Sequence, residues 1–271
     1  VVHLKKVVDI IMDDIYPQDV GLLSLLTLKE HNEYAYVHSV NVGIISMLLA
    51  KKTGLKENEL REVGMGAFLH DVGKINMPVE MIWKMDGETE EEKKVIREHP
   101  MFGHSILKKT GGIPEGVLDI VLKHHEHYNG TGYPSGIDDK GINPQVRVVS
   151  ICNHYDNQIT AVEGKVPATP REALLRIQKL AGTVFNPLIV HSFLREMTRH
   201  LMDGPVYPVG SVVLLSTKEF AVVREIRKES DLQPLVDIIS DINGRKLQRP
   251  IRVDLRNDET RKVHQVVNVP R

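Results

Sequence analysis

Histidine and aspartate residues lie close together in one part of this sequence, and that combination can bind metal ions. The chain has 13 histidines. One of them forms the pair His70-Asp71 at the end of an apolar segment, and Lys74 follows three residues after the aspartate. Neutral imidazole is the commonest metal ligand, and the two oxygens of a carboxylate can bridge two ions. A single His-Asp pair is more often a cap or a surface pair, because aspartate readily bonds to local backbone.

Four further histidines strengthen the metal-site interpretation, because each lies at an end or on the apolar side of a segment with helical periodicity. They are His38, His99, His124 and His125. Helices can direct such side chains into the interior of a bundle, where facing positions build metal sites. With His70 and Asp71, these histidines predict a site for two metal ions. Lys74 then has the charge to meet a phosphate oxygen.

The candidate ligands lie in a region of helical periodicity that runs from Tyr34 to about Met202. Apolar spacing, a proline or a capping pair marks the start of most segments, and glycines mark several ends. We expect helices over residues 1–30, 34–54, 58–70, from 89, 100–111, 114–125, from 169 and 187–203. The first of these is amphipathic, and it either covers the core or provides a packing or dimer face.

Beyond Gly204 the sequence changes to short runs of β-branched residues. Such runs predict strands over 211–215, 220–226, 235–240 and 251–255, and Asn243-Gly244 predicts a hairpin turn. We therefore expect a mainly α protein with three parts: an N-terminal helical segment (1–30), a helical domain (31–203) and a small β-rich module (204–271). The arginines between 245 and 256 alternate with strand residues, which favours a solvated strand face.

Composition and charge exclude several classes of protein. The 271 residues carry 35 Lys+Arg and 36 Asp+Glu, a balance without the basic bias of a dedicated nucleic-acid binder. The single cysteine, Cys152, excludes an internal disulfide and fits a reducing compartment. No apolar run approaches the roughly 20 residues of a membrane helix, and no signal peptide opens the chain, so we expect a cytoplasmic location. From the amphipathic first segment and the start at Val1 rather than Met, we also expect an upstream sensory domain or signalling partner, or a homodimer.

The motifs occur in an order that resembles the HD-GYP family, a subset of the HD-domain metal-dependent phosphohydrolases. They are His38, His70-Asp71-Val72-Gly73-Lys74, His99-Pro100-x-x-Gly103, His124-His125-Glu126 and Gly130-Thr131-Gly132-Tyr133-Pro134-x-Gly136. The resemblance, which covers roughly residues 31–200, implies an all-helical catalytic domain with two or three divalent metal ions. Iron or manganese is expected first, with zinc, nickel or cobalt as alternatives. The resemblance also implies hydrolysis of the bacterial second messenger cyclic di-GMP to linear pGpG.

The resemblance implies a role for each matching residue. One metal ion is held by His38, His70, Asp71 and the residue at position 153, and the other by Asp71, His99, His124 and His125. Asp71 bridges the two ions, and Lys74 faces the scissile phosphate. The residues that shape or contact the substrate are Gly132, Tyr133, Pro134 and Lys165.

Three positions depart from the family pattern. Asn153 replaces the late metal-binding aspartate and is a weaker, neutral ligand, whereas Asp156, one turn further on, matches an aspartate that is not a ligand. Tyr34 replaces the glutamate of three-metal members, which favours a two-metal centre. Val162 replaces an arginine that contacts the dinucleotide, which leaves Lys165 as the basic residue there.

Different classes of function fit these residues. The first is a phosphodiesterase that cuts cyclic di-GMP with a hydroxide activated by two metal ions. The second, motivated by Asn153 and Val162, is a degenerate metal-binding sensor or partner-binding module with little or no turnover. A third interpretation keeps the chemistry but assigns another nucleotide, because a fold does not fix its substrate.

Overall fold

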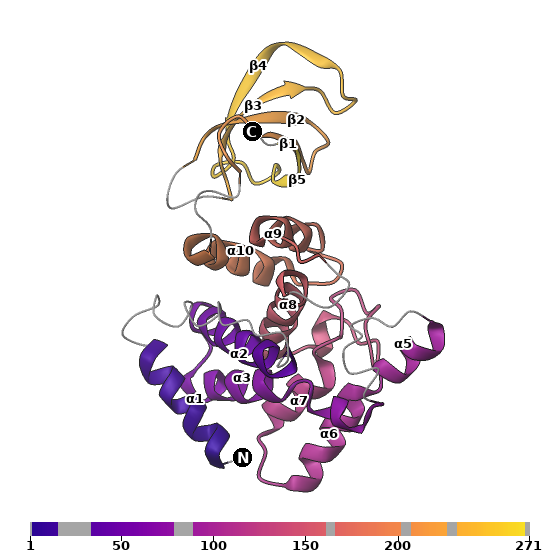
Figure 1. The fold of residues 1–271 in the computed structure, drawn as a ribbon. Coiled ribbons are helices and arrows are strands. Elements are labelled where there is room, and N and C mark those ends of the chain that lie inside the picture. Colours follow the sequence, from indigo (N-terminus) through magenta and orange to yellow (C-terminus); the bar gives the residue numbers. More distant parts are fainter. Residues whose placement is uncertain are drawn as a thin grey trace. The chain divides into compact units, whose positions relative to one another are not determined.

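The computed structural model of the chain describes residues 2–15, 34–78, 89–160, 166–201, 207–226 and 232–268 (Figure 1). The chain divides into two compact units. The first contains Val1–Ala168 and Leu180–Phe193, and the second contains Thr169–Lys179 and Leu194–Arg271. Among the described residues, no helix combines the length and the apolar character that crossing a membrane requires.

Helices build the first unit, as the sequence predicts. Its α-helices are α1 (Val2–Ile15), α2 (Tyr34–Lys52), α3 (Glu57–Leu69), α5 (Glu90–Ile96), α6 (His99–Thr110), α7 (Glu115–Lys123) and α8 (Pro144–Ile159), and α10 (Pro187–Leu201) begins in it. The 3-10 helix η2 (Val72–Asn76) follows α3, and η3 (Asp139–Gly141) precedes α8. The mainly helical class expected from the sequence is confirmed.

The core of this unit is centred on α2, whose second half is buried on every side. Ile44, Ile45 and Leu49 are each no more than 1% exposed. A helix that is apolar all round is stable only when its neighbours cover it, and both α3 and α8 pack against α2. Because α2 carries His38 and His70 directly follows α3, this packing brings two candidate ligands into the same interior.

Local signals place several helix ends as predicted. The Thr89 hydroxyl accepts a bond from the Glu92 N–H, and the Glu92 carboxylate accepts one from the Thr89 N–H, each at 3.2 Å. This reciprocal pair is the capping box that starts α5. Gly111 ends α6 with φ +72°, a left-handed conformation that glycine adopts without a steric penalty. The helix α8 was not among the predicted helices, and its start is capped by the Asn143 side chain, which accepts a bond from the Val146 N–H at 2.9 Å.

The first helix is described over fewer residues than expected. The helix α1 ends at Ile15, and residues 16–33, which the sequence analysis included in part, lie outside the described residues. Val8 and Met12 are buried, and Asp9 accepts a hydrogen bond from Arg61 of α3 at 2.8 Å. In this unit α1 therefore covers the core, which is one of its two predicted roles. A dimer face stays a prediction.

The second unit contains an antiparallel sheet with the strand order β4-β3-β2-β1-β5. The strands are β1 (Val212–Leu215), β2 (Phe220–Glu225), β3 (Leu235–Ser240), β4 (Lys246–Asp254) and β5 (Val263–Asn268). Their inward residues form one apolar cluster, which includes Val213, Val223 and Val236. The expected β-rich character is confirmed, and Gly244 makes the predicted turn with φ +79°. The sequence analysis did not predict β5, and β4 starts at Lys246 rather than at residue 251.

A helix also belongs to this second unit. The helix α9 (Pro170–Lys179) starts at the predicted capping pair, where the Glu172 carboxylate accepts a bond from the Thr169 N–H at 2.9 Å. Leu175 packs against the sheet core, and Gln178 donates to the Val263 carbonyl at 2.6 Å. The sheet unit thus includes a helix that a boundary at residue 204 assigns to the helical domain.

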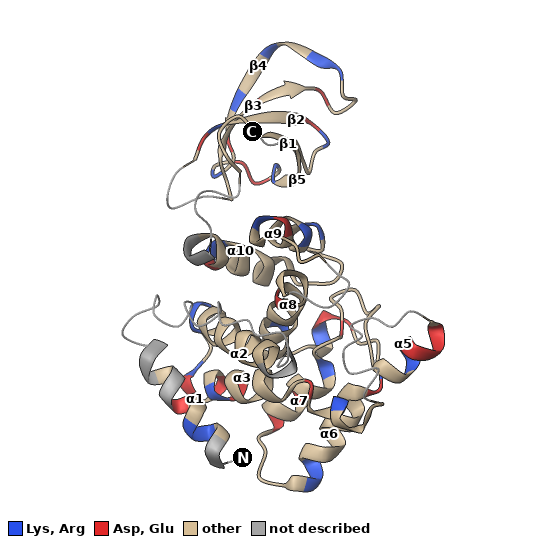
Figure 2. Cartoon of the chain, viewed as in Figure 1, with Lys and Arg blue, Asp and Glu red and all other residues tan. Residues whose placement is uncertain are grey.

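The arginines of β4 and its end lie on an exposed strand (Figure 2). Arg252 contacts Asp237 of β3 at 2.9 Å, and Arg256 contacts Asp254 at 2.6 Å. The side chains of Arg252 and Arg256 are 65% and 35% exposed, although the Asp237 carboxylate is buried. They fit the predicted solvated strand face.

Candidate metal centre

Asp71 lies at the centre of the histidine cluster, and its two oxygens face different histidines. Its Oδ2 atom is 3.4 Å from Nε2 of His70 and 3.9 Å from Nε2 of His38. Its Oδ1 atom is 3.2 Å from Nε2 of His99 and 3.9 Å from Nε2 of His124. One carboxylate therefore joins two groups of imidazoles, which is the arrangement that a bridging ligand requires.

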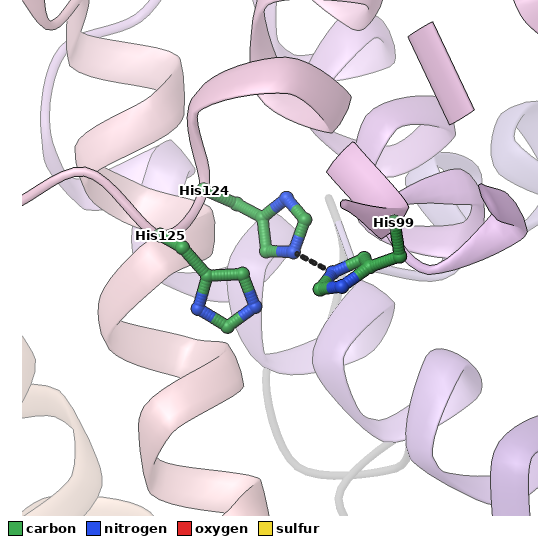
Figure 3. A group of neighbouring side chains, drawn as sticks. All are labelled: His99, His124 and His125. Carbon is green, nitrogen blue, oxygen red and sulfur yellow. Dashed lines mark hydrogen bonds between the residues drawn. The ribbon is translucent and has the colours of Figure 1, made fainter. Parts of the chain in front are cut away.

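The histidines converge from four segments of the first unit. The Nε2 atoms of His38 and His70 lie 3.2 Å apart, and the same distance separates those of His99 and His124. Figure 3 shows His99, His124 and His125 with their rings turned toward a common space. The ligand atoms of this trio lie within 4.8 Å of one another, as do those of His38, His70 and Asp71. The structure thus brings together the five histidines that the sequence singled out.

Backbone carbonyls set the proton position on three of these rings. The Nδ1 atoms of His70, His99 and His124 lie 2.7, 2.6 and 3.0 Å from the carbonyl oxygens of residues 67, 96 and 121. A carbonyl oxygen only accepts, so Nδ1 carries the proton and Nε2 of the neutral ring keeps a lone pair.

Facing lone pairs make the cluster fit a divalent cation. The Nε2 atoms 3.2 Å apart within each histidine pair have no proton to share when the rings are neutral. Their lone pairs repel each other unless a positive charge binds between or beside them. Nitrogen donors mixed with a carboxylate suit iron, manganese, zinc, nickel or cobalt. The donor set therefore fits the metal ions that the resemblance implies.

A buried carboxylate holds the fourth ring, His38. Its Nδ1 atom is 2.7 Å from Oδ2 of Asp156, which lies on α8 and is fully buried. Asp156 also accepts bonds from the Asn41 amide at 2.9 Å and the Thr160 hydroxyl at 3.1 Å. A carboxylate behind a metal-binding imidazole fixes the tautomer and raises the basicity of the opposite nitrogen.

Electrostatics keep the candidate ligands in their metal-binding protonation states. Burial raises the pKa of Asp71, but the charge of Lys74 and the adjacent His70 outweigh it, so the pKa is well below its usual range. The Lys74 ammonium donates to Oδ2 of Asp71 at 2.6 Å. Burial, reinforced by neighbouring imidazoles, lowers the pKa of His124 and His125 well below 6.5. The carboxylate is therefore ionised and these rings are neutral near pH 7.

Gly73 sets the approach of two backbone segments in the centre. A Cβ atom on Gly73 would collide with the His99 carbonyl oxygen and with the Gly103 N–H. Because η2 and the start of α6 touch through their backbones, Asp71 comes within reach of His99. This close contact explains why residues 73 and 103 are both glycines.

Glu126 organises the loop that follows the histidine pair. Its buried carboxylate accepts three backbone N–H bonds, from Ser135 at 2.7 Å, Gly136 at 3.1 Å and Ile137 at 3.1 Å. At Gly132 a Cβ would collide with the backbone of residues 125–127. The loop is thus packed onto the segment that carries the histidines.

Tyr133 connects that loop to the metal cluster. Its ring stacks on the His125 imidazole, with centroids 4.5 Å apart and an angle of 14° between the planes. The Tyr133 N–H donates to the His125 carbonyl at 3.1 Å, and the bond to Pro134 is cis. The Arg97 guanidinium lies over the same ring, with Cζ 5.3 Å from its centroid. Tyr133 therefore fixes the plane of His125, whereas contact with a substrate stays a prediction.

Asn153 is buried on α8 between two anchors of the centre. Three residues before it, Ser150 donates to the His124 carbonyl at 2.8 Å, and three residues after it Asp156 holds His38. The Asn153 Oδ1 atom accepts a bond from Asn157 at 2.9 Å. Residues three apart share a helix face, so Asn153 lies on the face that contacts both histidine groups. Its role as a ligand stays a prediction.

The remaining predicted positions take no visible part in the cluster or lie outside the described residues. Lys165 and Val162 fall outside them, as does the side chain of Tyr34. Cys152 is buried, and burial raises the pKa of its thiol to about 12, which agrees with an inert structural cysteine. The His154 ring packs against Phe185, with centroids 5.3 Å apart.

Sequence reasoning missed three contributions to this site. The Asp156 carboxylate was recognised as a motif position but not as the partner of His38. Glu126 was part of a motif without an assigned role. Arg97 carried no signal in the sequence, because an isolated arginine two residues before a histidine is unremarkable in itself.

Matches to known proteins agree with this site. The chain matches the HD domain family over residues 25–189, and residues 212–270 match the KOW domain associated with HD domains. A cyclic di-GMP phosphodiesterase of Pseudomonas aeruginosa is 32% identical over 236 residues, which cover 87% of this chain and 55% of that protein. A cyclic di-GMP phosphodiesterase response regulator of Xanthomonas campestris pv. campestris is 35% identical over 153 residues, which cover 56% of this chain and 40% of that protein.

The fold has a counterpart among solved structures. A protein of Bdellovibrio bacteriovorus described as an HDG"Y"P protein superimposes with a TM-score of 0.60 and 24% identity, covering 72% of this chain and 61% of that one. The chain spans about half the length of the curated relatives it matches, or less. By its family match and its ordered motifs, the chain belongs to the HD-domain family, in its HD-GYP subset.

Proposed function

We propose that this chain is a metal-dependent phosphodiesterase that hydrolyses cyclic di-GMP to linear pGpG. The observation that carries the proposal is the position of Asp71, whose Oδ1 and Oδ2 atoms face two different pairs of imidazole nitrogens. The names of the P. aeruginosa and X. campestris relatives support the substrate. A cytoplasmic location, an upstream sensory domain and a homodimer stay predictions.

The proposed metal ligands form two sets that share Asp71. The first set is His38, His70, Asp71 and Asn153, and the second is Asp71, His99, His124 and His125. Two divalent ions, iron or manganese first, would supply Lewis acidity that activates water and neutralises phosphate charge. The protein's part is to hold the ligand atoms in place, and it does so through the carbonyls and the carboxylate behind the rings.

Lys74 supplies positive charge beside the proposed reaction centre. Its side chain is partly exposed and ends 2.6 Å from Asp71. A phosphodiester gains negative charge on its oxygens as the bond to the leaving group breaks, and a positioned ammonium stabilises that charge. We assign Lys74 to the scissile phosphate on this basis.

The loop after the histidine pair forms the proposed substrate contact. Gly132, Tyr133 and Pro134 belong to this loop, and Tyr133 stacks on His125. Because His125 and Arg97 both lie over the Tyr133 ring, we assign the edge of the ring, with its phenol group, to the dinucleotide. Lys165 remains part of the proposal as a further cation for the dinucleotide. The packing of Tyr133 on His125 means that a bound nucleotide would meet a ring whose plane is already fixed.

A sensor with little turnover is a second candidate, and Asn153 favours it. Its amide is neutral, and its Oδ1 atom already accepts a bond from Asn157. A neutral ligand binds a divalent ion more weakly than a carboxylate does. The chain would then bind metal or a dinucleotide without converting it.

One experiment separates the two candidates. The protein is incubated anaerobically with cyclic di-GMP and Fe(II) or Mn(II), and the nucleotides are separated by chromatography while bound metal is measured on the same sample. Linear pGpG over many turnovers, lost in Asp71→Asn and in chelator-treated protein, supports the phosphodiesterase. Intact cyclic di-GMP beside a fully loaded centre contradicts it and favours the sensor. Parallel incubation with 3′3′-cGAMP tests the choice of nucleotide.

A further inference from the structure

Arg97 is an exposed cation close to the metal centre, and it belongs neither to the proposed metal ligands nor to the proposed substrate loop. It follows the last residue of α5 and precedes His99 by two residues. Its guanidinium lies over the Tyr133 ring, which is itself stacked on His125. One aromatic ring therefore connects this cation to a proposed metal ligand.

Within the described residues, the guanidinium of Arg97 lies over the Tyr133 ring and makes no hydrogen bond. A guanidinium over an aromatic ring uses its flat face for the cation–π contact. Its N–H donors lie in the guanidinium plane, in a fork that matches the oxygens of a phosphate. The contact with Tyr133 thus restricts where the guanidinium lies without occupying the groups that bind an anion.

Nearby cations differ from Arg97 because they already have carboxylate partners. Lys74 pairs with Asp71 at 2.6 Å, and Lys93 of α5 pairs with Glu90 at 2.7 Å. Within the part of the chain that the structure describes, Arg97 has no carboxylate within 4.0 Å, and its partner is an uncharged ring. The charge of Arg97 also acts on Glu90, but that carboxylate is paired with Lys93 and lies beyond 4.0 Å from Arg97. The guanidinium is therefore available to an anionic ligand of the metal centre.

The proposed substrate carries a second negative charge that the metal centre does not bind. A cyclic dinucleotide contains two phosphodiester groups, of which one is cleaved at the metal ions and the other stays intact. The intact group is an anion that needs a cation a short distance from the centre. We propose that Arg97, held over Tyr133, binds this uncleaved phosphate and thereby selects cyclic dinucleotides over simple phosphodiesters. This inference rests on the proposed function.

The proposal predicts that Arg97 acts on binding rather than on the chemical step. Arg97→Ala should raise KM for cyclic di-GMP about tenfold and leave kcat within about twofold, since it removes a charge-assisted bond that is the same before and during the reaction. The salt dependence of kcat/KM should also weaken, because one attractive charge is gone. Arg97→Lys should restore part of the affinity, because it keeps the charge but not the fork.

A substrate with a single phosphate provides the internal control. Bis(p-nitrophenyl) phosphate contains one phosphodiester, which the metal centre binds, and no second phosphate for Arg97. Its hydrolysis should be the same in Arg97→Ala and in the unchanged protein. Lys94→Ala removes an exposed cation from the same helix and should leave both substrates unaffected. Bound metal, measured for each variant, should stay the same.

Tyr133 should be coupled to Arg97 in the same assay. In a Tyr133→Leu background, Arg97→Ala should raise KM for cyclic di-GMP by less than it does in the unchanged protein, because the ring no longer places the guanidinium. Tyr133→Phe keeps the ring and should keep the full effect.

The outcomes separate this inference from the proposed function. An unchanged KM for cyclic di-GMP in Arg97→Ala, in a protein that hydrolyses it, overturns the inference alone. Equal losses on both substrates, or a loss of bound metal, assign Arg97 to the support of His125 and also overturn it. A protein that hydrolyses only bis(p-nitrophenyl) phosphate contradicts the proposed substrate, and the inference falls with it. A raised KM for cyclic di-GMP alone supports both.

Discussion

The Nδ1 atom of His38 lies 2.7 Å from the Oδ2 atom of Asp156, across 118 residues of sequence. A buried carboxylate thus stands behind one imidazole, whereas backbone carbonyls stand behind His70, His99 and His124. A carboxylate polarises an imidazole more strongly than a carbonyl does. The two histidine groups around Asp71 are therefore chemically unequal, and they should differ in metal affinity.

Removing the Asp156 charge should weaken one metal position. Asp156→Asn keeps the shape of the side chain but removes the charge behind His38, and affinity at that position should fall about 10- to 100-fold. Competition with a chelator, followed by metal analysis, measures the change. Glu91→Gln, an exposed position on α5, is the control. Two positions that weaken equally would contradict the assignment of Asp156 to His38.

Restoring a carboxylate at position 153 should strengthen the centre. Asn153→Asp adds a charged oxygen on the α8 face that contacts both histidine groups, so metal affinity and the initial rate of cyclic di-GMP hydrolysis should rise. The rate at limiting Mn(II) measures both effects. Asn157→Ala is the matched variant, since it releases Oδ1 of Asn153 without adding charge. An unchanged rate in a folded Asn153→Asp protein would count against the view that Asn153 limits turnover.

Lys74 should act on the chemical step. Lys74→Ala removes charge from the proposed phosphate position, and kcat should drop by about 10²-fold, the scale of losing one preorganised electrostatic contact. Steady-state kinetics with the metal content measured in parallel separates this effect from loss of metal. Lys74→Arg should recover part of kcat. Full activity in Lys74→Ala would remove the residue from the reaction.

Glu126 should stabilise the loop that carries Tyr133. Glu126→Ala leaves three backbone N–H groups without their carboxylate partner, which should lower the free energy of unfolding by about 2–4 kcal/mol. Urea unfolding measures the change, and Glu98→Gln, which alters an exposed carboxylate, serves as control. If the variant unfolds at the same urea concentration as the unchanged protein, the loop does not depend on this anchor.

The stability of the metal-free chain should depend on pH in a defined direction. Burial lowers the pKa of His124 and His125 in the folded state well below the 6.5 of the unfolded chain. Below pH 6.5 the unfolded chain binds more protons, so the free energy of unfolding should fall as the pH decreases from there. The contribution of Asp71, whose folded pKa is lowered from 3.8, should persist until the pH falls below that value.

Unfolding of chelator-treated protein at a series of pH values tests this prediction. The slope of unfolding free energy against pH below 6.5 should be smaller in His125→Gln than in the unchanged protein, because one of the two buried rings is gone. An identical slope would show that the burial of His125 does not cause the pH dependence.

Features that depend on neighbouring residues could be predicted from the sequence. Thr89 and Glu92 form a capping box because they are three residues apart, and Gly111 ends its helix by its own conformation. The histidine motifs follow the same logic, since His38 lies on the apolar side of its helix and the other four lie at helix ends. Their convergence on Asp71 required one further inference, that the helices form a single bundle.

Features that depend on distant packing were not predictable. The contacts of His38 with Asp156 and of Arg97 with the Tyr133 ring join segments whose spacing in sequence carries no signal. The predicted start of β4, at residue 251, lies too far along the chain. The first residues of this strand are exposed and polar, so they lack the alternation of a half-buried strand. Whether Asn153 is a ligand depends on an atom position that the sequence cannot specify.

Gly73 gives the centre a property that its ligands alone do not. Because η2 and α6 meet through main-chain atoms at this residue, the backbone sets how closely the segment of His70 and Asp71 approaches the segment of His99. The ligands are therefore arranged when the chain folds, and an arriving ion meets a preorganised site with little chain entropy left to lose. Even one methyl group at position 73 would push the η2 segment away from the start of α6. The glycine therefore limits the distance between Asp71 and His99.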